Sequence, residues 1–333
     1  MTHQLVKDIG ERGLLKKIQS FCSLEIVGDD GAVLNVTPNH RLVVTTDVLV
    51  DRVHFSDRTT AAFDVGWRSA AANLSDLAAM GANPLGITVG LSLPGETPLT
   101  WVEGLYRGLS SCLKQSHTPI VGGDITRSET ITVAITAMGE VLPHRAITRT
   151  QAKPGDAILI TGYHGLSKAG LELLLDPNLG KDLNSTEKEF LIKTHQRPQP
   201  RLDVVAKLRE IAPDVVVAGM DSSDGLADAI AQICRCSGVG AVIDIPSIPQ
   251  CSILAKFPTH IPLEQWILNG GEDFELVLAA SPQLARNLLS HLGEEAAIIG
   301  QITEESKIIY RRSEREFLDN NISNSIAGFE HFS

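Results

Sequence analysis

The sequence predicts a mixed α/β (or α+β) protein of two domains. Its 333 residues are enough for two domains that each bury a core of their own. Aromatic residues make up 5% of the chain, while Ala, Gly, Val, Ile and Leu are plentiful, as in close-packed strands and helices. A turn signal, Lys-Pro-Gly-Asp, ends the segment 149–156, and a new strand follows it. We therefore expect domains at 1–150 and 151–333.

The first half of the chain alternates strands with helices. Segment 61–80 has the composition of a long helix, which Gly81 and Pro84 would end. Segment 130–139 alternates apolar and polar residues, as a half-buried strand does. The elements expected here are strands at 41–50, 86–93 and 130–139 and helices at 61–80 and 97–116.

The second half again mixes the two kinds of element. A surface loop is expected at 175–185, where the sequence is LDPNLGKDLNS. The expected helices lie near 200–211 and 224–234, and the expected strands lie at or near 157–161, 215–218, 241–245, 275–280 and 298–302.

The overall charge limits the partners of this chain. A formal net charge of −11 repels phosphate backbones, so we expect no nucleic acid as partner. The same charge allows phosphate binding where divalent cations bridge the negative groups. The five cysteines form no CxxC pair, the first residues are too charged for a signal peptide, and no apolar run approaches 18 residues. We therefore expect a cytoplasmic protein that binds no membrane.

Acidic residues recur in unusual surroundings. Six segments place acids among Gly, Ser, Thr and apolar neighbours rather than among other charges. Together they indicate one site for hard cations, since Mg²⁺ prefers oxygen ligands and often bridges to phosphates. The segments are GDDGAVL (28–34), TTDVLV (45–50), NLSDLAAMGA (73–82), GGDIT (122–126), GMDSSDGLADAI (219–230) and GGEDFELVL (270–278).

Two of these acids have a structural context that can be predicted. Asp76 shares one face of its helix with Ser69 and Asn73, where a lone buried carboxylate would need a partner. Asp47 is expected at the end of its strand, where α/β proteins often place ligand-binding groups. The alternatives are a surface or backbone-bonded Asp76 and a turn-forming Asp47.

The other acids also have simpler interpretations. Asp30 and Asp124 follow glycines, which permit close approach to an anion or a metal but are equally typical of turns. Asp221 and Asp224 bracket two serines before a helix, and Asp224 alone could serve as its N-cap.

Common nucleotide-binding and catalytic motifs are missing. The sequence contains no GxxxxGK[ST], GxGxxG, HRD-type kinase or GxSxG motif, and the ten histidines form no zinc-type pair. The nearest glycine-rich segment, GYHGLSK at 162–168, has the wrong spacing for a phosphate loop. A nucleotide would then be held through metals, backbone amides and scattered basic residues such as Arg127, Arg149 or Lys153.

Seven ordered motifs together resemble the thiamine-monophosphate kinase family of the aminoimidazole-ribonucleotide synthetase superfamily, from about Gly10 to the C-terminus. They are GDDGAVL, TTDVLVDRVHF, NLSDLAAMGANP, GGDITR, Ile147–Arg149 followed by AKPGD, SSDGL and GGEDFEL, and the closing GFEHF (328–332) also fits. The resemblance implies ATP-dependent phosphorylation of thiamine monophosphate to thiamine diphosphate, with several Mg²⁺ ions as cofactors. It also implies N-terminal domains that pair as a homodimer and close a β-barrel. ATP would lie in a cleft near that interface, and the C-terminal α/β domain would complete the active site.

The resemblance also implies roles for individual residues, carried over position by position. The residues similar to magnesium ligands are Asp30, Thr45, Thr46, Asp47, Asp76, Asp124, Asp221 and Asp224. Those similar to ATP-binding residues are Tyr106, Gly123, Asp124, Arg149 and Ser223. Those similar to residues that hold the thiamine substrate are His54, Glu272 and Phe329. At 219–223 this chain has GMDSS where many relatives have a shorter pattern, but its acids keep the spacing of three.

The implied chemistry needs no general base. The second pKa of a phosphate monoester is about 6, so the acceptor oxygen is already ionised at neutral pH. Direct in-line transfer then depends on positioning and on neutralising charge. Two alternatives remain open: another ATP-dependent synthetase of the superfamily, or a non-catalytic nucleotide-binding maturation factor. Cys22 lies in FCSLE rather than in a glycine-rich segment, and the chain ends in GFEHFS rather than in cysteine, which disfavours both.

Overall fold

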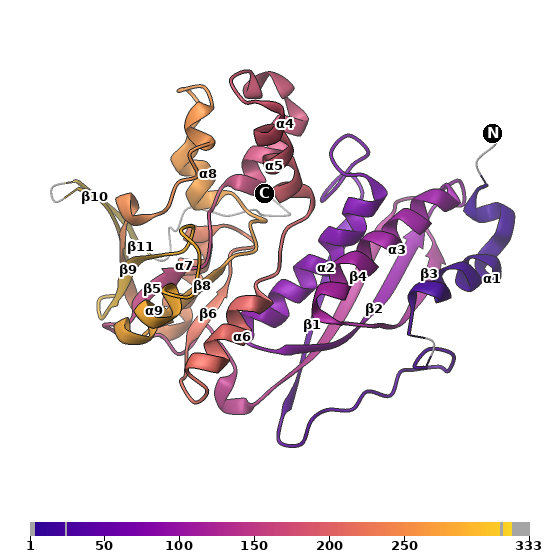
Figure 1. Cartoon of the computed structure of the whole chain (residues 1–333), viewed down its shortest axis with the longest axis horizontal. Helices are drawn as coiled ribbons and strands as arrows, with labels where there is room; N and C mark the ends of the chain where they lie inside the picture. Colours follow the sequence, from indigo (N-terminus) through magenta and orange to yellow (C-terminus); the bar gives the residue numbers. More distant parts are fainter. Residues whose placement is uncertain (1–3, 24, 314–315, 322–333) are drawn as a thin grey trace. The chain divides into compact units, whose positions relative to one another are not determined.

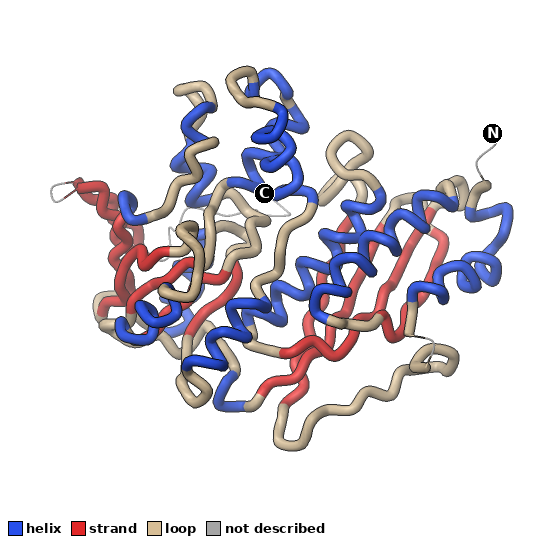
Figure 2. The backbone as a smooth tube through the Cα atoms, viewed as in Figure 1, coloured by secondary structure: helices blue, strands red, loops and turns tan. Residues whose placement is uncertain are grey.

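The structure, a computed structural model, describes residues 4–23, 25–313 and 316–321. The chain divides into two compact units, each with one sheet and its helices (Figures 1 and 2). Unit 1 comprises Met1–Leu77 and Asn83–Val141, and unit 2 comprises Ala78–Ala82 and Leu142–Ser333. The predicted mixed α/β architecture of two domains is confirmed.

Unit 1 is a four-stranded sheet with helices on one face (Figure 1). The strand order β1-β4-β2-β3 places β1 and β3 at the two edges. β4 is antiparallel to both β1 and β2, and β3 is parallel to β2. The elements are α1 (Val6–Ile18), β1 (Arg41–Val50), α2 (Ala62–Ala79), β2 (Asn83–Leu93), α3 (Leu99–Leu113), β3 (Ile120–Arg127) and β4 (Thr132–Val141).

The two faces of this sheet differ in burial. Residues that pair directly across strands point to the same face, and successive residues alternate between faces. Val89 and Ile135 pair with each other, are 1% exposed, and belong to the face that α2 and α3 cover. On the other face Val44 and Val48 of β1 are 57% and 44% exposed. This second face is a small-residue and threonine-rich surface that is open within one chain.

α2 and α3 approach each other backbone to backbone. A side-chain carbon at Gly66 would overlap the carbonyl oxygen of Leu105, and one at Gly108 would overlap that of Phe63. The two glycines thus allow the helices to pack closely over the sheet, which fixes where the polar face of α2 lies.

Unit 2 is a seven-stranded, mostly antiparallel sheet of order β11-β10-β7-β9-β5-β8-β6. Neighbouring residues of β5 enter two apolar cores, with Ile160 in one and Leu159 in the other. The strands are β5 (Ala157–Ile160), β6 (Ala218–Asp221), β7 (Gly240–Asp244), β8 (Leu276–Ala280), β9 (Ala297–Thr303), β10 (Lys307–Ser313) and β11 (Glu316–Asn321). The helices are α4 (Leu166–Leu175), α5 (Ser185–Gln196), α6 (Leu202–Ile211), α7 (Leu226–Ser237), α8 (Leu263–Asn269) and α9 (Pro282–Leu289).

Most of the expected elements are present within a few residues of their predicted bounds. The strand expected near 215–218 was placed too early in the sequence. Val215 and Val216 are 45% and 43% exposed, and the strand begins at Ala218. The expected loop at 175–185 contains a short 3₁₀ turn, Pro177–Gly180. Strands β3, β10 and β11 and helices α1, α4, α5, α8 and α9 were not predicted. Along the described residues, every helix is too short or too polar to cross a membrane.

The close packing of α2 and α3 gives a first prediction. Gly108→Ala places a methyl group against the backbone of Phe63, so the helices must separate. Overpacking of this kind costs about 1–3 kcal/mol of unfolding free energy. Urea denaturation should show this loss, whereas Arg107→Ala, at an exposed position of the same helix, should leave the midpoint nearly unchanged. Equal midpoints for both variants would contradict the packing described here.

Candidate functional site

The first group of candidate residues joins β1 to α2. The Thr45 hydroxyl donates a hydrogen bond to Oδ2 of Asp76, and the backbone N–H of Asp47 donates to Oδ1 of Asn73 at 3.2 Å. Asn73 is fully buried, and its amide donates in turn to the carbonyl of Ser69 at 3.0 Å. The predicted polar face of α2 is confirmed, and it lies against the edge strand.

Asp47 lies within its strand rather than at the end of it. β1 continues to Val50, so the expectation that Asp47 lies at the end of the strand is wrong. The alternation of the strand places Thr45 and Asp47 on the helix-covered face. Thr46 points to the open face, where its hydroxyl is 2.8 Å from that of Thr136.

Asp124 lies at the other edge of the same sheet. The turn interpretation of GGDIT is wrong, because these residues form β3. Asp124 pairs with Gly90, Gly90 with Ala134, and Ala134 with Val48, so Asp124 is on the open face. Three strand spacings separate β1 from β3, which is roughly 14 Å. Within one chain Asp47 and Asp124 therefore lie on opposite edges and opposite faces.

The remaining candidates of unit 1 are dispersed. Asp30 is exposed in the segment before β1. Just after β1, Nδ1 of His54 accepts a hydrogen bond from the N–H of Val50 at 3.1 Å. Tyr106 is 2% exposed in α3, with its ring 5.7 Å from that of Phe21, and burial raises its pKa far above the usual range. Gly123 precedes Asp124 in β3, where a side chain would overlap the backbone of Val89.

In unit 2 the end of β6 and the segment after it carry three candidates. Asp221 ends the strand and is 3% exposed, and the Ser223 hydroxyl donates to it at 3.0 Å. Asp224 is exposed, and the N-cap of α7 is Gly225, so the N-cap interpretation of Asp224 is wrong. From a separate segment, Nη1 of Arg149 donates to Oε1 of Gln232 on α7, at 2.6 Å.

The loop that carries Glu272 is attached to this segment. The N–H of Glu272 donates to the carbonyl of Ser223 at 2.7 Å. A side-chain carbon at Gly271 would be 2.6 Å from that same carbonyl oxygen, so glycine is needed for the close approach. Two segments some 50 residues apart in sequence thus bring Asp221, Ser223 and Glu272 together. Phe329, the third substrate candidate, lies outside the described residues.

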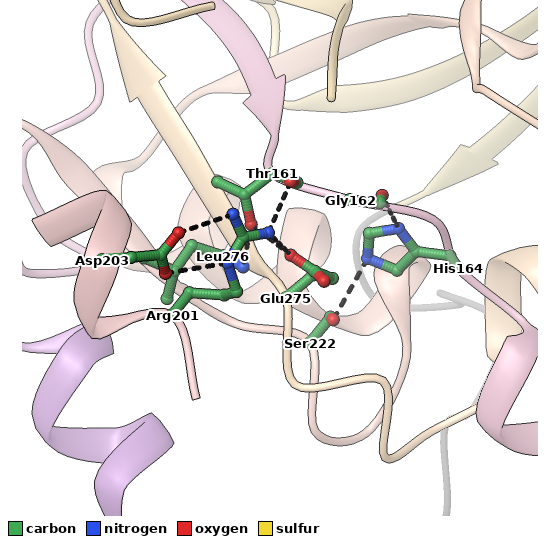
Figure 3. Close-up of polar contacts among 8 residues, drawn as sticks. All are labelled: Thr161, Gly162, His164, Arg201, Asp203, Ser222, Glu275 and Leu276. Atoms are coloured by element: carbon green, nitrogen blue, oxygen red, sulfur yellow. Dashed lines mark hydrogen bonds and ion pairs between the residues drawn. The ribbon is translucent and has the colours of Figure 1, made fainter. Parts of the chain in front are cut away.

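A buried polar network supports these two segments (Figure 3). Nη1 of Arg201 donates to Oε2 of Glu275 and to the carbonyl of Thr161, each at 2.6 Å. The Thr161 hydroxyl also donates to Glu275, at 2.6 Å, and accepts from the N–H of Leu276 at 2.8 Å. Asp203 pairs with the other side of Arg201. Glu275 directly follows the Glu272 loop, so the network fixes where that loop ends.

Two further buried groups were not predicted from the sequence. Nε2 of His164 is 3.1 Å from the Ser222 hydroxyl and Nδ1 is 3.2 Å from the Gly162 carbonyl (Figure 3). Burial lowers the pKa of His164 to about 4, so the ring is neutral. Burial raises the pKa of Asp273 to about 7, although two backbone N–H donors oppose the rise. The sequence contained one signal for each group: a histidine in the glycine-rich segment 162–168 and an acid in the glycine-rich segment 270–275.

The donor set indicates what these groups can bind. Among the described residues, no three His, Cys, Asp or Glu side chains lie close enough to hold a metal ion by themselves. The candidates supply carboxylate and hydroxyl oxygens, which suit hard divalent cations that complete their coordination with phosphate and water.

Comparison with known proteins places this chain in a family. The AIR synthase related protein N-terminal domain matches residues 28–141, and the corresponding C-terminal domain matches residues 153–311. Thiamine-monophosphate kinase of Synechococcus elongatus is 48% identical over 100% of this chain and 99% of that protein. The chain belongs to the thiamine-monophosphate kinase family.

Solved structures of thiamine-monophosphate kinases share the fold. The enzyme from Stenotrophomonas maltophilia K279a aligns with a TM-score of 0.78 at 34% identity, covering 89% of this chain and 95% of that one. A structure described as AaThiL complexed with AMPPCP and TMP aligns with a TM-score of 0.73 at 30% identity, covering 96% and 99%.

The Arg201–Glu275 pair gives a second prediction. Arg201→Ala leaves Glu275 buried without its cation, and breaking a buried pair costs about 3–5 kcal/mol. The variant should unfold at clearly lower urea concentration. Lys207→Ala breaks a more exposed pair on α6, the helix that begins after Arg201, and should have little effect. A small loss for Arg201→Ala would mean that the network contributes little.

The neutral state of His164 gives a third prediction. The folded pKa of about 4 lies below the unfolded value of about 6.5, so the unfolded chain binds more protons between these pH values. His164 therefore contributes stability that is present above pH 6.5 and is lost as the pH falls towards 4. In urea titrations, His164→Asn should show a shallower loss over this window than the wild type. Parallel curves would contradict a neutral buried imidazole.

Proposed function

We propose that this chain transfers the γ-phosphate of ATP to thiamine monophosphate and forms thiamine diphosphate. The observation that carries the proposal is the identity of 48% with a thiamine-monophosphate kinase over the whole chain. A related structure that holds AMPPCP and TMP supports the choice of substrates, and it is matched over 96% of this chain. The carboxylate and hydroxyl oxygens on β1, α2 and β6 could bind cations and so support a reaction between two anions.

The proposed cofactor is Mg²⁺, which when bound neutralises phosphate charge and bridges phosphate oxygens. The residues proposed to hold it are oxygen donors, as this ion requires: Asp30, Thr45, Thr46, Asp47, Asp76, Asp124, Asp221 and Asp224. The Thr45–Asp76 hydrogen bond and the buried Asn73 amide orient part of this set before any ligand arrives. Such preorganisation lowers the cost of binding.

The other candidates are proposed to hold the two organic ligands. Tyr106, Gly123, Asp124, Arg149 and Ser223 would contact ATP, and His54, Glu272 and Phe329 would contact the thiamine substrate. The chain then needs no proton acceptor, because the acceptor phosphate is ionised near neutral pH. Its own residues bind both anions, align them and exclude water.

We further propose that a complete metal site takes residues from two copies of this chain. Asp47 and Asp124 lie on opposite edges and faces of one sheet, roughly 14 Å apart. The open face also exposes the apolar side chains of Leu42, Val44 and Val48 on its edge strand, which a second copy would cover. A homodimer that joins β3 of one copy to β1 of the other, as in a closed barrel, would reduce the separation of the strands that carry Asp124 and Asp47 from three strand spacings to one, with the two side chains on opposite faces of the joined sheet.

The direct test of the reaction compares acceptors. Purified protein with ATP and Mg²⁺ should convert thiamine monophosphate to thiamine diphosphate, with one ADP formed per product. The acceptors of aminoimidazole-ribonucleotide synthetase and of selenophosphate synthetase should give no product. Excess EDTA should abolish turnover, and added Mg²⁺ should restore it. No diphosphate with Mg²⁺ present, or full turnover in EDTA, would end the proposal.

A fourth prediction concerns one proposed ligand. Asp47→Asn keeps the shape of the side chain but removes its charge, so turnover should fall about 10²-fold or more. The melting temperature should change little, since the bond to Asn73 uses the Asp47 backbone. Glu129→Gln, at an exposed position on the turn after β3, is the matched control and should keep full activity. Intact turnover with lost stability would assign Asp47 a structural role.

A further inference from the structure

The glycine-rich segment 162–168, whose spacing does not match a phosphate loop, instead binds a carboxylate of the protein itself. Thr161–Ser167, here called the bracket, leads from β5 into the first turn of α4. The N–H groups of Gly165 and Ser167 donate to the two carboxylate oxygens of Asp273 at 2.6 and 2.8 Å. A helix N-terminus favours an anion, and here the anion is a side chain of the protein itself.

Asp273 belongs to the loop that carries Glu272, and its two neighbours have unusual backbone angles. Glu272 has φ 68° and Phe274 has φ 54°. Both values lie in the left-handed region, which residues with ordinary side chains avoid. Such conformations persist only where the surroundings enforce them. The bidentate contact of Asp273 with the bracket lies between the two strained residues, so it is placed to enforce them.

The bracket also touches the other candidate segment of unit 2. His164 is held between Gly162 of the bracket and Ser222, which lies between Asp221 and Ser223 (Figure 3). Ser167 is 3.1 Å from Nδ1 of the buried His195, and that nitrogen is 3.8 Å from Oε2 of Glu272. The bracket thus contacts Asp273, the chain neighbour of Glu272, and also His195, which lies beside the Glu272 side chain.

We propose that Asp273 is a positioning residue for the acceptor substrate: by occupying the N-terminus of α4, it holds the Glu272 loop in the conformation that presents Glu272 to thiamine monophosphate. The inference rests on the proposed function and adds to it a residue that does not itself touch the substrate. It predicts weaker binding of the acceptor rather than of ATP. The reason is that one of the two strained neighbours of Asp273 is Glu272, the proposed acceptor contact.

The test uses Asp273→Asn in the full chain. Asparagine has the same shape, but its NH₂ group would face one of the two N–H donors, so one hydrogen bond is lost. The KM for thiamine monophosphate should rise about tenfold or more, while the KM for ATP should change less than about twofold. Asp244→Asn removes a carboxylate of β7 that pairs with Arg311 of β10; it is the control and should alter neither constant.

Hydrogen exchange gives a readout that does not depend on catalysis. In Asp273→Asn the peptides covering 161–168 and 270–276 should both exchange faster, and in Asp244→Asn they should not. If Asp273→Asn does not fold, thiamine monophosphate added to the wild type should slow exchange of both peptides together. Unchanged KM values, equal rises for both substrates, or exchange confined to one peptide would overturn the inference. A wild type without kinase activity would instead refute the proposed function, and the exchange comparison would still test the bracket.

Discussion

A carboxylate that leaves water needs hydrogen-bond donors or cations, because an unpaired buried charge costs several kcal/mol. This constraint determines how the acids of this chain are arranged. Asp273 is met by two backbone N–H groups, Glu275 by Arg201 and Thr161, and Asp76 by Thr45. The proposed magnesium ions would meet the same need, because they would neutralise acids and phosphates that otherwise repel one another.

The strand alternation in unit 1 adds a second constraint. Neighbouring residues of a strand point to opposite faces, so Thr45 and Asp47 meet α2 while Thr46 and Asp124 face away from it. These four residues are all proposed metal ligands, yet within one folded chain they lie on different faces and edges of the sheet. Assembly of two copies is the proposed way to bring the two edges of the sheet together, and it would also cover the apolar residues of the open face.

The sequence predicted those features that depend on local periodicity. The polar face of α2 follows from the spacing of Ser69, Asn73 and Asp76, and the structure confirms it. β3 was missed because Gly122 and Gly123 are poor strand formers. The buried network was missed because its partners are far apart in the chain, with Glu275 lying 114 positions after Thr161. Long-range polar pairs leave no periodic pattern in one sequence.

The central claim is that Asp47 and Asp124 serve one catalytic site from two copies of the chain, and mixing two inactive variants tests it most directly. Asp47→Asn and Asp124→Asn, unfolded together and refolded in equal amounts, form hybrids in half of the dimers. Each hybrid would contain one intact site of two, so activity should recover to about a quarter of the wild-type value. If both acids instead served the site of their own chain, both sites of every hybrid would carry a substitution, and the hybrids would be inactive. No recovery above the separate variants, with hybrids shown to form, would contradict the account.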